Sequence, residues 1–202
     1  MVITSRGLAA LLNEWVYGEV WERPDLSKRD RSLATIAVAQ AMGASSELRS
    51  HLGRGLDNGV TQTEIGELIA HVAFYSGIPS AVNAARVAAA VFEARNLPMP
   101  QAEFPAAPYL EALVDGLLAE TWERPDLSAR ERSLITMAVA QTLYSTDELR
   151  SQMERALENG ITPQEISELI AQVTLYSGFP MGVNSSRTAG TLFQERGLPM
   201  PR

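Results

Sequence analysis

Residues 21–27, with the sequence WERPDLS, return without a change as residues 122–128. Outward from this stretch, residues 21–100 align without a gap with residues 122–201, and 46 of these 80 positions are identical. A repeat with a period of about 101 residues is too long for a solenoid and indicates a duplicated domain. We therefore predict two homologous domains, residues 1–100 and 109–202, joined by a linker over residues 101–108 in which Pro105 and Pro108 prevent a helix.

Capping signals and apolar periodicity predict five to six helices in each copy. In the first copy they are expected at residues 8–20, 27–42, 46–57 and 61–75, with a further helix after Pro79. Ser27 with Asp30, and Ser128 with Glu131, have the spacing of a capping box at the start of the second helix of each copy. The predicted fold class is all-α, with two tandem homologous helical domains.

Composition narrows the classes of function. The formal net charge of -7 and the pI near 4.9 argue against a nucleic-acid partner, which requires clustered Lys and Arg. No apolar run approaches the roughly 20 residues needed to span a bilayer, and no basic segment with an apolar signal core begins the sequence, so we expect a cytoplasmic protein without a membrane partner. With no cysteine and two histidines, we expect no thiolate chemistry, no metal site and no cofactor.

The two copies differ most informatively at their histidines. His51 and His71 are the two histidines of the chain, and the second copy has Gln152 and Gln172 at the same places. Imidazole titrates near neutral pH, whereas a glutamine amide of similar reach cannot exchange a proton. This difference suggests one working site in the first copy and a retired or accessory one in the second.

Helical spacing groups further side chains with the histidines. Glu47 and His51 are four residues apart, so a carboxylate could hydrogen-bond the imidazole and raise its pKa. Glu67, His71 and Tyr75 also follow one another at four-residue steps and would form an acid-base row along one helix face. The second copy keeps the carboxylates and the tyrosine of this pattern: Glu148, Glu168 and Tyr176.

Several segments together carry a resemblance to a known family. They are residues 21–26 (WERPDL), 31–33 (RSL), 47–51 (ELRSH), 58–65 (NGVTQTEI) and 71–79 (HVAFYSGIP). In this order and spacing they resemble the carboxymuconolactone decarboxylase family. The related alkylhydroperoxidase D branch has a C-x-x-C pair where this chain has Ala44 and Glu47, so peroxidase chemistry is not expected. The resemblance implies an all-helical fold and hexamers of single domains, and hence a homo-oligomer of three two-repeat chains.

The resemblance also implies a reaction. The family's reference substrate is an unsaturated lactone with carboxylates that loses carbon dioxide without a cofactor, through a dienolate that needs a donor at oxygen and a proton on carbon. One of His51 and His71 would stabilise the oxyanion and the other would deliver the proton. The expected catalytic residues are His51, His71, Glu47 and Tyr75. The expected substrate-binding residues are Arg31, Arg49, Trp21 and Glu67, and the second-copy counterparts are Gln152, Gln172, Glu148 and Tyr176.

Other interpretations stay open at this stage. The same pocket could catalyse a cofactor-free cyclisation or isomerisation of a larger natural-product-like substrate, because fold and site type do not fix a reaction. A non-catalytic assembly protein is a third possibility, in which both histidines would titrate like exposed residues. Individually, the Glu47 and His51 pair could be an exposed helix pair, Tyr75 a core aromatic, Trp21 a turn anchor, and the arginines structural. The two copies could share one site or build separate ones.

Overall fold

The computed structural model describes residues 5–98, 116, 119–143 and 146–201, and this part of the chain is helical without strands. The predicted linker, residues 101–108, lies outside the described residues. The first copy forms α1 (Arg6–Ala10), the π-helical η1 (Leu11–Tyr17), the 3-10 turn η2 (Val20–Glu22), α2 (Lys28–Ala41), α3 (Ser45–Asp57), α4 (Gln62–Ser76) and α5 (Ile78–Ala94). The second copy forms α7 (Ala129–Leu143), α8 (Thr146–Glu158), α9 (Pro163–Ser177) and α10 (Phe179–Glu195). The all-α prediction is confirmed.

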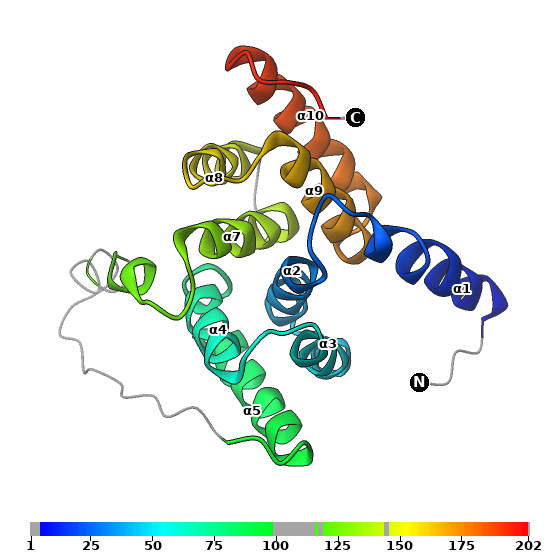
Figure 1. The fold of residues 1–202 in the computed structure, drawn as a ribbon, viewed down its shortest axis with the longest axis vertical. Helices are drawn as coiled ribbons and strands as arrows, with labels where there is room; N and C mark the ends of the chain where they lie inside the picture. Colours follow the sequence, from blue (N-terminus) through cyan, green and yellow to red (C-terminus); the bar gives the residue numbers. More distant parts are fainter. Residues whose placement is uncertain (1–4, 99–115, 117–118, 144–145, 202) are drawn as a thin grey trace.

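The two copies pack directly on each other through α2 and α7, which lie side by side at the centre of the bundle (Figure 1). Helix α2 also contacts α9, and α7 also contacts α4, so each central helix touches both copies. A helix that is buried on nearly all sides needs small and apolar residues around its circumference. Accordingly, Leu33, Ile36 and Val38 on α2, and Ile135 and Val139 on α7, belong to one apolar core shared by the copies.

Helix capping at the start of α2 and α7 follows the predicted positions with one difference. Ser27 accepts a hydrogen bond from the backbone N–H of Asp30, and Ser128 accepts one from the backbone N–H of Glu131. Glu131 also accepts from the backbone N–H of Ser128 at 2.7 Å, which completes the box. The shorter Asp30 carboxylate instead accepts a hydrogen bond from Arg130 of the other copy at 3.1 Å.

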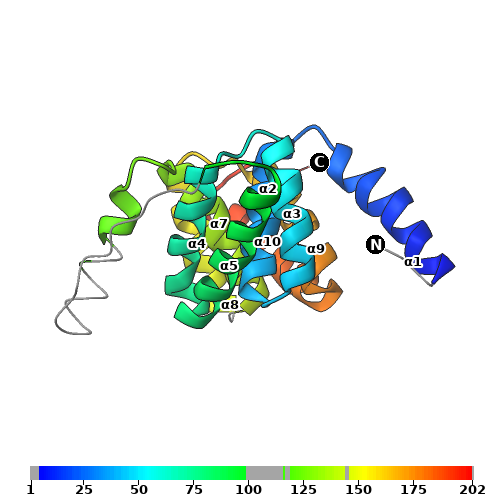
Figure 2. The ribbon, with the colours of Figure 1, turned by 90° about the horizontal axis from the view of Figure 1, so that it is seen from below.

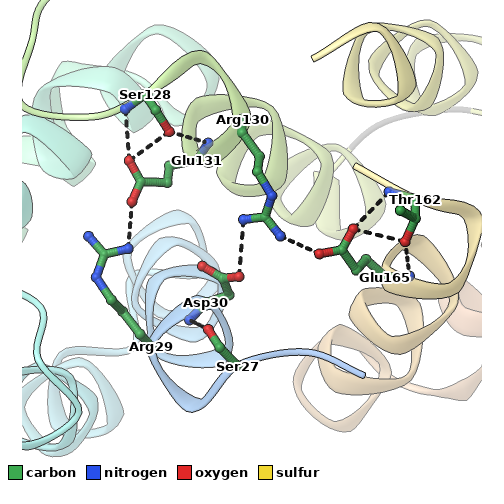
Figure 3. A network of polar contacts seen from close by, with 8 residues as sticks. All are labelled: Ser27, Arg29, Asp30, Ser128, Arg130, Glu131, Thr162 and Glu165. Carbon is green, nitrogen blue, oxygen red and sulfur yellow. Dashed lines mark hydrogen bonds and ion pairs between the residues drawn. The ribbon is translucent and has the colours of Figure 1, made fainter. Parts of the chain in front are cut away.

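Ion pairs therefore join the ends of the central helices across the repeat (Figure 3). Arg130 on α7 bridges Asp30 on α2 and Glu165 on α9, and Arg29 on α2 pairs with Glu131 on α7. The five side chains are between one tenth and one third exposed, so their charges are partly shielded from solvent. Bridges of this kind fix the register of the two copies more than they stabilise the fold.

Two predicted helix limits differ from the structure. The helix expected over residues 8–20 begins at Arg6, widens into η1 and stops at Gly18, where a Cβ would lie 2.7 Å from the carbonyl oxygen of Glu14. The helix expected after Pro79 begins at Ile78, because proline fits the first turn of a helix, where no N–H partner is needed. Gly77 precedes it with a φ of 85°, which favours glycine.

The segment formed by α1 and η1 extends away from the bundle (Figures 1 and 2). Three of its large apolar side chains are exposed, Leu8, Leu11 and Trp15, whereas Val16 is buried. Within the described residues, no helix combines the length and apolarity required to cross a bilayer.

Candidate active site

The polar residues of the interior form two clusters that correspond to each other through the repeat. The first, here called the His51 cluster, consists of Trp21, Arg31, Thr35, His51, Glu168, Gln172 and Tyr176. The second, the His71 cluster, consists of Glu67, His71, Tyr75, Trp122, Arg132 and Thr136. Both clusters contain residues of both copies. The His51 cluster lies where α2 of the first copy contacts α9 of the second, and the His71 cluster lies where α4 of the first copy contacts α7 of the second.

His51 lies between aromatic rings of the two copies. Its ring stacks on Trp21 with centroids 6.1 Å apart and meets Tyr176 edge-on at 5.3 Å. Trp21 comes from η2 of the first copy and Tyr176 from α9 of the second, and the indole N–H of Trp21 donates to the Tyr176 hydroxyl at 3.3 Å. The WERPDL turn, which is identical in the two copies, therefore places Trp21, 4% exposed, as one wall of this cluster.

Arg31 is the cation of the His51 cluster and is fully buried. It donates to the side-chain oxygen of Gln172 at 3.3 Å and to Glu168 at 3.2 Å. Gln172 in turn donates to the Thr35 hydroxyl at 3.1 Å, so both ends of its amide are used. Arg23 makes three further contacts of 2.5 to 2.9 Å to Glu168. Although burial raises the pKa of the Glu168 carboxyl, these arginines hold it below its ordinary value.

His71 occupies the corresponding place on α4 of the first copy. Its Nε2 lies 2.6 Å from the hydroxyl of Thr136 on α7, and its ring meets Trp122 edge-on with centroids 5.2 Å apart. The ring of Tyr75 lies 5.3 Å away, as the four-residue spacing predicts. Glu67, the third member of the predicted row, faces Arg132, whose Nη2 lies 3.1 Å from it.

The structure thus separates the two histidines that the sequence analysis placed in one working site. His51 contacts Tyr176 and shares a cluster with Gln172, whereas His71 contacts Trp122 and Thr136. Each cluster joins residues of both copies, so the second-copy residues form no separate degenerate site. Spacing along one helix could not show this, because it does not tell which helix lies opposite.

Burial gives both imidazoles a lower basicity than the spacing predicted. Burial, followed by the charge of Arg54, lowers the pKa of His51 to about 4. Burial and the charge of Arg132 lower the pKa of His71 to about 3. The expected rise through Glu47 is not found: Glu47 is exposed, and Nδ1 of His51 has no partner among the described residues. Both imidazoles are therefore neutral at pH 7, and the exposed titration expected of an assembly protein is also not found.

The remaining predicted residues lie at the margins of the clusters. Arg49 is exposed and lines a surface hollow of about 650 Å³ with Arg54 and Arg95. Gln152 donates to Glu148 at 2.8 Å, the contact that was expected between Glu47 and His51. His51 and His71 do not line this hollow, and the charges of its exposed arginines are screened by ions of the solvent. The two buried clusters are therefore the better candidates for the active site.

The sequence analysis missed two threonines of the clusters and two arginines that border them. Thr35 and Thr136, and Arg23 and Arg124, are identical in the two copies and lie beside the histidine or carboxylate positions. The exact retention of the WERPDL turn was the available signal for the second pair. Among the described residues, no three His, Cys, Asp or Glu side chains gather as metal ligands.

Fold and clusters together define a duplicated helical protein with two related, buried imidazole sites. The sequence profile of the carboxymuconolactone decarboxylase family matches residues 6–90 and 107–187, and the chain belongs to this family.

Three related proteins are similar to parts of this chain. Over 82 residues the chain is 45% identical to 4-carboxymuconolactone decarboxylase of Acinetobacter baylyi, covering 41% of this chain and 61% of that protein. Over 74 residues it is 42% identical to nitrosuccinic acid decarboxylase of Metarhizium robertsii, covering 37% and 52%. An uncharacterized 15.0 kDa protein of Paracoccus denitrificans is 31% identical over 86 residues, covering 42% and 63%. The aligned part thus spans between 52% and 63% of the length of these relatives.

Proposed function

We propose that the protein is a cofactor-free carboxy-lyase that acts on a small carboxylated lactone or a related acid. Membership in the carboxymuconolactone decarboxylase family and the two decarboxylases among its relatives support this activity. The observation that carries the proposal is a buried neutral imidazole, His71, in one cluster with a buried arginine, Arg132. An arginine can bind a substrate carboxylate, and a neutral imidazole can donate a hydrogen bond or exchange a proton.

The chemistry of such a substrate requires little from the protein. When the bond to the departing carboxylate breaks, its electron pair moves through the ring alkene onto the lactone carbonyl and gives a dienolate. The substrate itself is the electron sink, so the protein needs to hold a second carboxylate, donate a hydrogen bond to the developing oxyanion, and pass one proton to carbon. Nδ1 of His71 is the ring nitrogen left for these tasks, because Nε2 contacts Thr136 and Nδ1 has no partner among the described residues.

Low basicity fits a role in hydrogen bonding better than a role as a permanent cation. With a pKa of about 3, the His71 imidazole stays neutral at pH 7. A neutral donor in a buried site can stabilise an oxyanion without attracting and holding the departing carboxylate. Thr136, 2.6 Å from Nε2, fixes the orientation of the ring, and a hydrogen bond donated by its hydroxyl to Nε2 would leave the proton on Nδ1. Tyr75, beside the ring, is the proposed second proton carrier.

We also propose that three chains assemble into one particle. The apolar side chains at the start of α5 and α10 are exposed at equivalent places, with Ile78 67% and Phe179 77% exposed. Equivalent apolar patches on both copies suit an assembly in which each copy makes the same contact. Light scattering after size-exclusion chromatography should give a mass of about 66 kDa, three times the 22.0 kDa chain.

The decarboxylase activity is tested with 4-carboxymuconolactone, the substrate in the name of the Acinetobacter relative. Proton NMR in deuterated buffer, after chelator treatment, should show the enol-lactone product with deuterium next to the lactone carbonyl. Replacement of His71 by glutamine, the residue of the second copy, should abolish turnover while the protein stays folded. The exposed variant Glu47→Gln serves as the matched control and should keep its rate. Turnover no faster than in buffer would refute the proposed substrate.

A further inference from the structure

The two clusters correspond position by position, yet their hydrogen-bond donors are used differently. We propose that the His71 cluster is the site that binds a carboxylate of the substrate, through Arg132 and Trp122, and that the His51 cluster holds its own side chains in the same positions and binds no ligand. This assignment rests on the proposed function for the class of ligand, and it concerns a difference between the copies that the family does not specify.

The two buried arginines show the difference directly. In the His51 cluster, Nη1 of Arg31 donates to the oxygen of Gln172 at 3.3 Å, and Nη2 donates to Glu168 at 3.2 Å and to a backbone carbonyl at 2.9 Å. In the His71 cluster, Arg132 is equally buried. Its Nε lacks a partner among the described residues, as that of Arg31 does, but its Nη1 lacks one as well. Burying a charged donor without a partner is unfavourable, so such groups are ordinarily matched by a ligand or by water.

The two tryptophans of the repeated turn follow the same pattern. The indole N–H of Trp21 donates to the Tyr176 hydroxyl at 3.3 Å. The indole nitrogen of Trp122 is buried and has no partner among the described residues. It belongs to the same cluster as Arg132, because both the Trp122 ring and the charge of Arg132 act on His71. Two donor nitrogens that have partners in the His51 cluster, the indole nitrogen and Nη1 of the guanidinium, are thus unused in the His71 cluster.

The exchange of His71 for Gln172 between the copies explains why Arg31 and Arg132 differ in their hydrogen bonds. A glutamine amide has one oxygen and one nitrogen, and Gln172 uses the oxygen for Arg31 and the nitrogen for Thr35. The imidazole of His71 uses its Nε2 for Thr136 and has no oxygen to offer Arg132. Histidine at this place thus leaves the guanidinium unmatched, whereas glutamine acts as a built-in substitute for a ligand oxygen.

Charge favours an anion in the His71 cluster. Glu168 receives three contacts of 2.5 to 2.9 Å from Arg23 as well as one from Arg31. Its counterpart Glu67 is held by one hydrogen bond of 3.4 Å from Arg124 and an ion pair of 3.1 Å with Arg132. A third cation, Arg155, lies over the Trp122 ring at 4.9 Å. Arg54 lies over the Trp21 ring in the same way, at 5.4 Å, so the two clusters have the same number of arginines. The difference is that Glu67 is held more loosely than Glu168, which leaves more of the positive charge for a second carboxylate.

The indole N–H signals test this assignment without any turnover. The chain has three tryptophans, and the indole signals of Trp15, Trp21 and Trp122 can be assigned in protein labelled with ¹⁵N-tryptophan by replacing each with phenylalanine. Succinate, a small dicarboxylate, is the probe. Titration should shift the Trp122 signal downfield with saturation and leave Trp21 and the exposed Trp15 in place. A saturable shift of Trp21, or none at Trp122, would overturn the assignment.

Reciprocal exchanges of histidine and glutamine sharpen the test. His71→Gln should weaken succinate binding at Trp122 about tenfold or more, because the new amide oxygen can accept from Arg132. Gln172→His should release Arg31 and produce a second saturable response, now at Trp21. His51→Gln is the matched control and should leave the Trp122 titration unchanged within twofold, with thermal unfolding checked for all three variants. Equal effects of the two histidine replacements would contradict the division between clusters.

This test is separate from the proposed reaction. Succinate binding at Trp122 in a protein that does not turn over 4-carboxymuconolactone would uphold the carboxylate site and refute the substrate. Turnover combined with unaltered succinate binding in His71→Gln would uphold the reaction and refute the role given to the His71 cluster.

Discussion

Replacing His71 by glutamine should make the stability of the protein less sensitive to acid. The perturbation is small in shape, since the second copy has Gln172 at the equivalent place of α9, where its side chain is fully buried. What changes is titration. His71 is buried with a pKa of about 3, whereas an unfolded chain has its imidazole at the ordinary value of 6.5. Below pH 6.5 the unfolded state therefore takes up a proton that the folded state does not.

The size and sign of the effect follow from this difference. The stability that comes from keeping His71 neutral is fully present above pH 6.5 and is lost as the pH falls toward 3. Protonation of the unfolded imidazole lowers the free energy of unfolding by about 2 kcal/mol at pH 5 and by about 4 kcal/mol at pH 3. His51, with a pKa of about 4, adds a loss of similar size at pH 5.

Urea unfolding followed by circular dichroism at pH 8, 7, 6 and 5 measures these terms. The free energy of unfolding should fall between pH 8 and pH 5 by about 2 kcal/mol less in His71→Gln than in the unaltered protein, and by about 4 kcal/mol less in the double variant with His51→Gln. Carboxylates such as Glu168, whose pKa is lowered, contribute equally to all variants and cancel in the comparison. Parallel curves for His71→Gln and the unaltered protein would show that this imidazole is protonated in the folded state, and the reasoning would be refuted.

Two further predictions concern packing and charge. Glu168→Gln should lower the free energy of unfolding by about 3 kcal/mol in urea titrations, because Arg31 would stay buried without its counter-charge. The control Glu47→Gln, on the exposed face of α3, should change the free energy of unfolding by less than about 0.5 kcal/mol. Gly182→Ala should cost about 1–3 kcal/mol, since the new Cβ would overlap Thr174, with its Cγ2 2.7 Å away. The first copy has alanine at both of these positions, so adding Thr174→Ala should restore most of the stability, and a double-mutant cycle without coupling would contradict this account of the α9–α10 contact.

Local signals in the sequence were sufficient for most of the fold. The WERPDLS turns, the caps at Ser27 and Thr61, and the glycine exits such as Gly59 are short-range features, and each lies where the structure has it. The expected start after Pro79 and the single helix over residues 8–20 were wrong in detail, because proline is compatible with a first turn and a π-helical segment has no simple sequence signal.

The composition of the sites was harder to predict for a physical reason. Along one helix, Glu67, His71 and Tyr75 do share a face, as their spacing requires. The groups that complete the cluster come from α7, which is more than 50 residues away in sequence. Arg31 illustrates the same limit: its spacing suggests a surface or binding residue, and its burial depends on a counter-charge, Glu168, from the other copy.

Duplication changes what the loss of a histidine means. Two identical copies packed about α2 and α7 would give two identical clusters. In each, the position of His71 or Gln172 is on α4 or α9 and the position of His51 or Gln152, both buried, is on α3 or α8. Replacing both histidines of one copy by glutamine then removes one imidazole from each cluster rather than two from one. His51 remains beside Gln172, and His71 remains in the cluster opposite. The two clusters no longer have the same chemistry after such an exchange, because the remaining imidazole sits at a different position in each. In a symmetric assembly of single copies, a substitution changes every site at once. In a fused chain, a substitution in one copy changes the two clusters differently, so two equal sites can become two unequal ones.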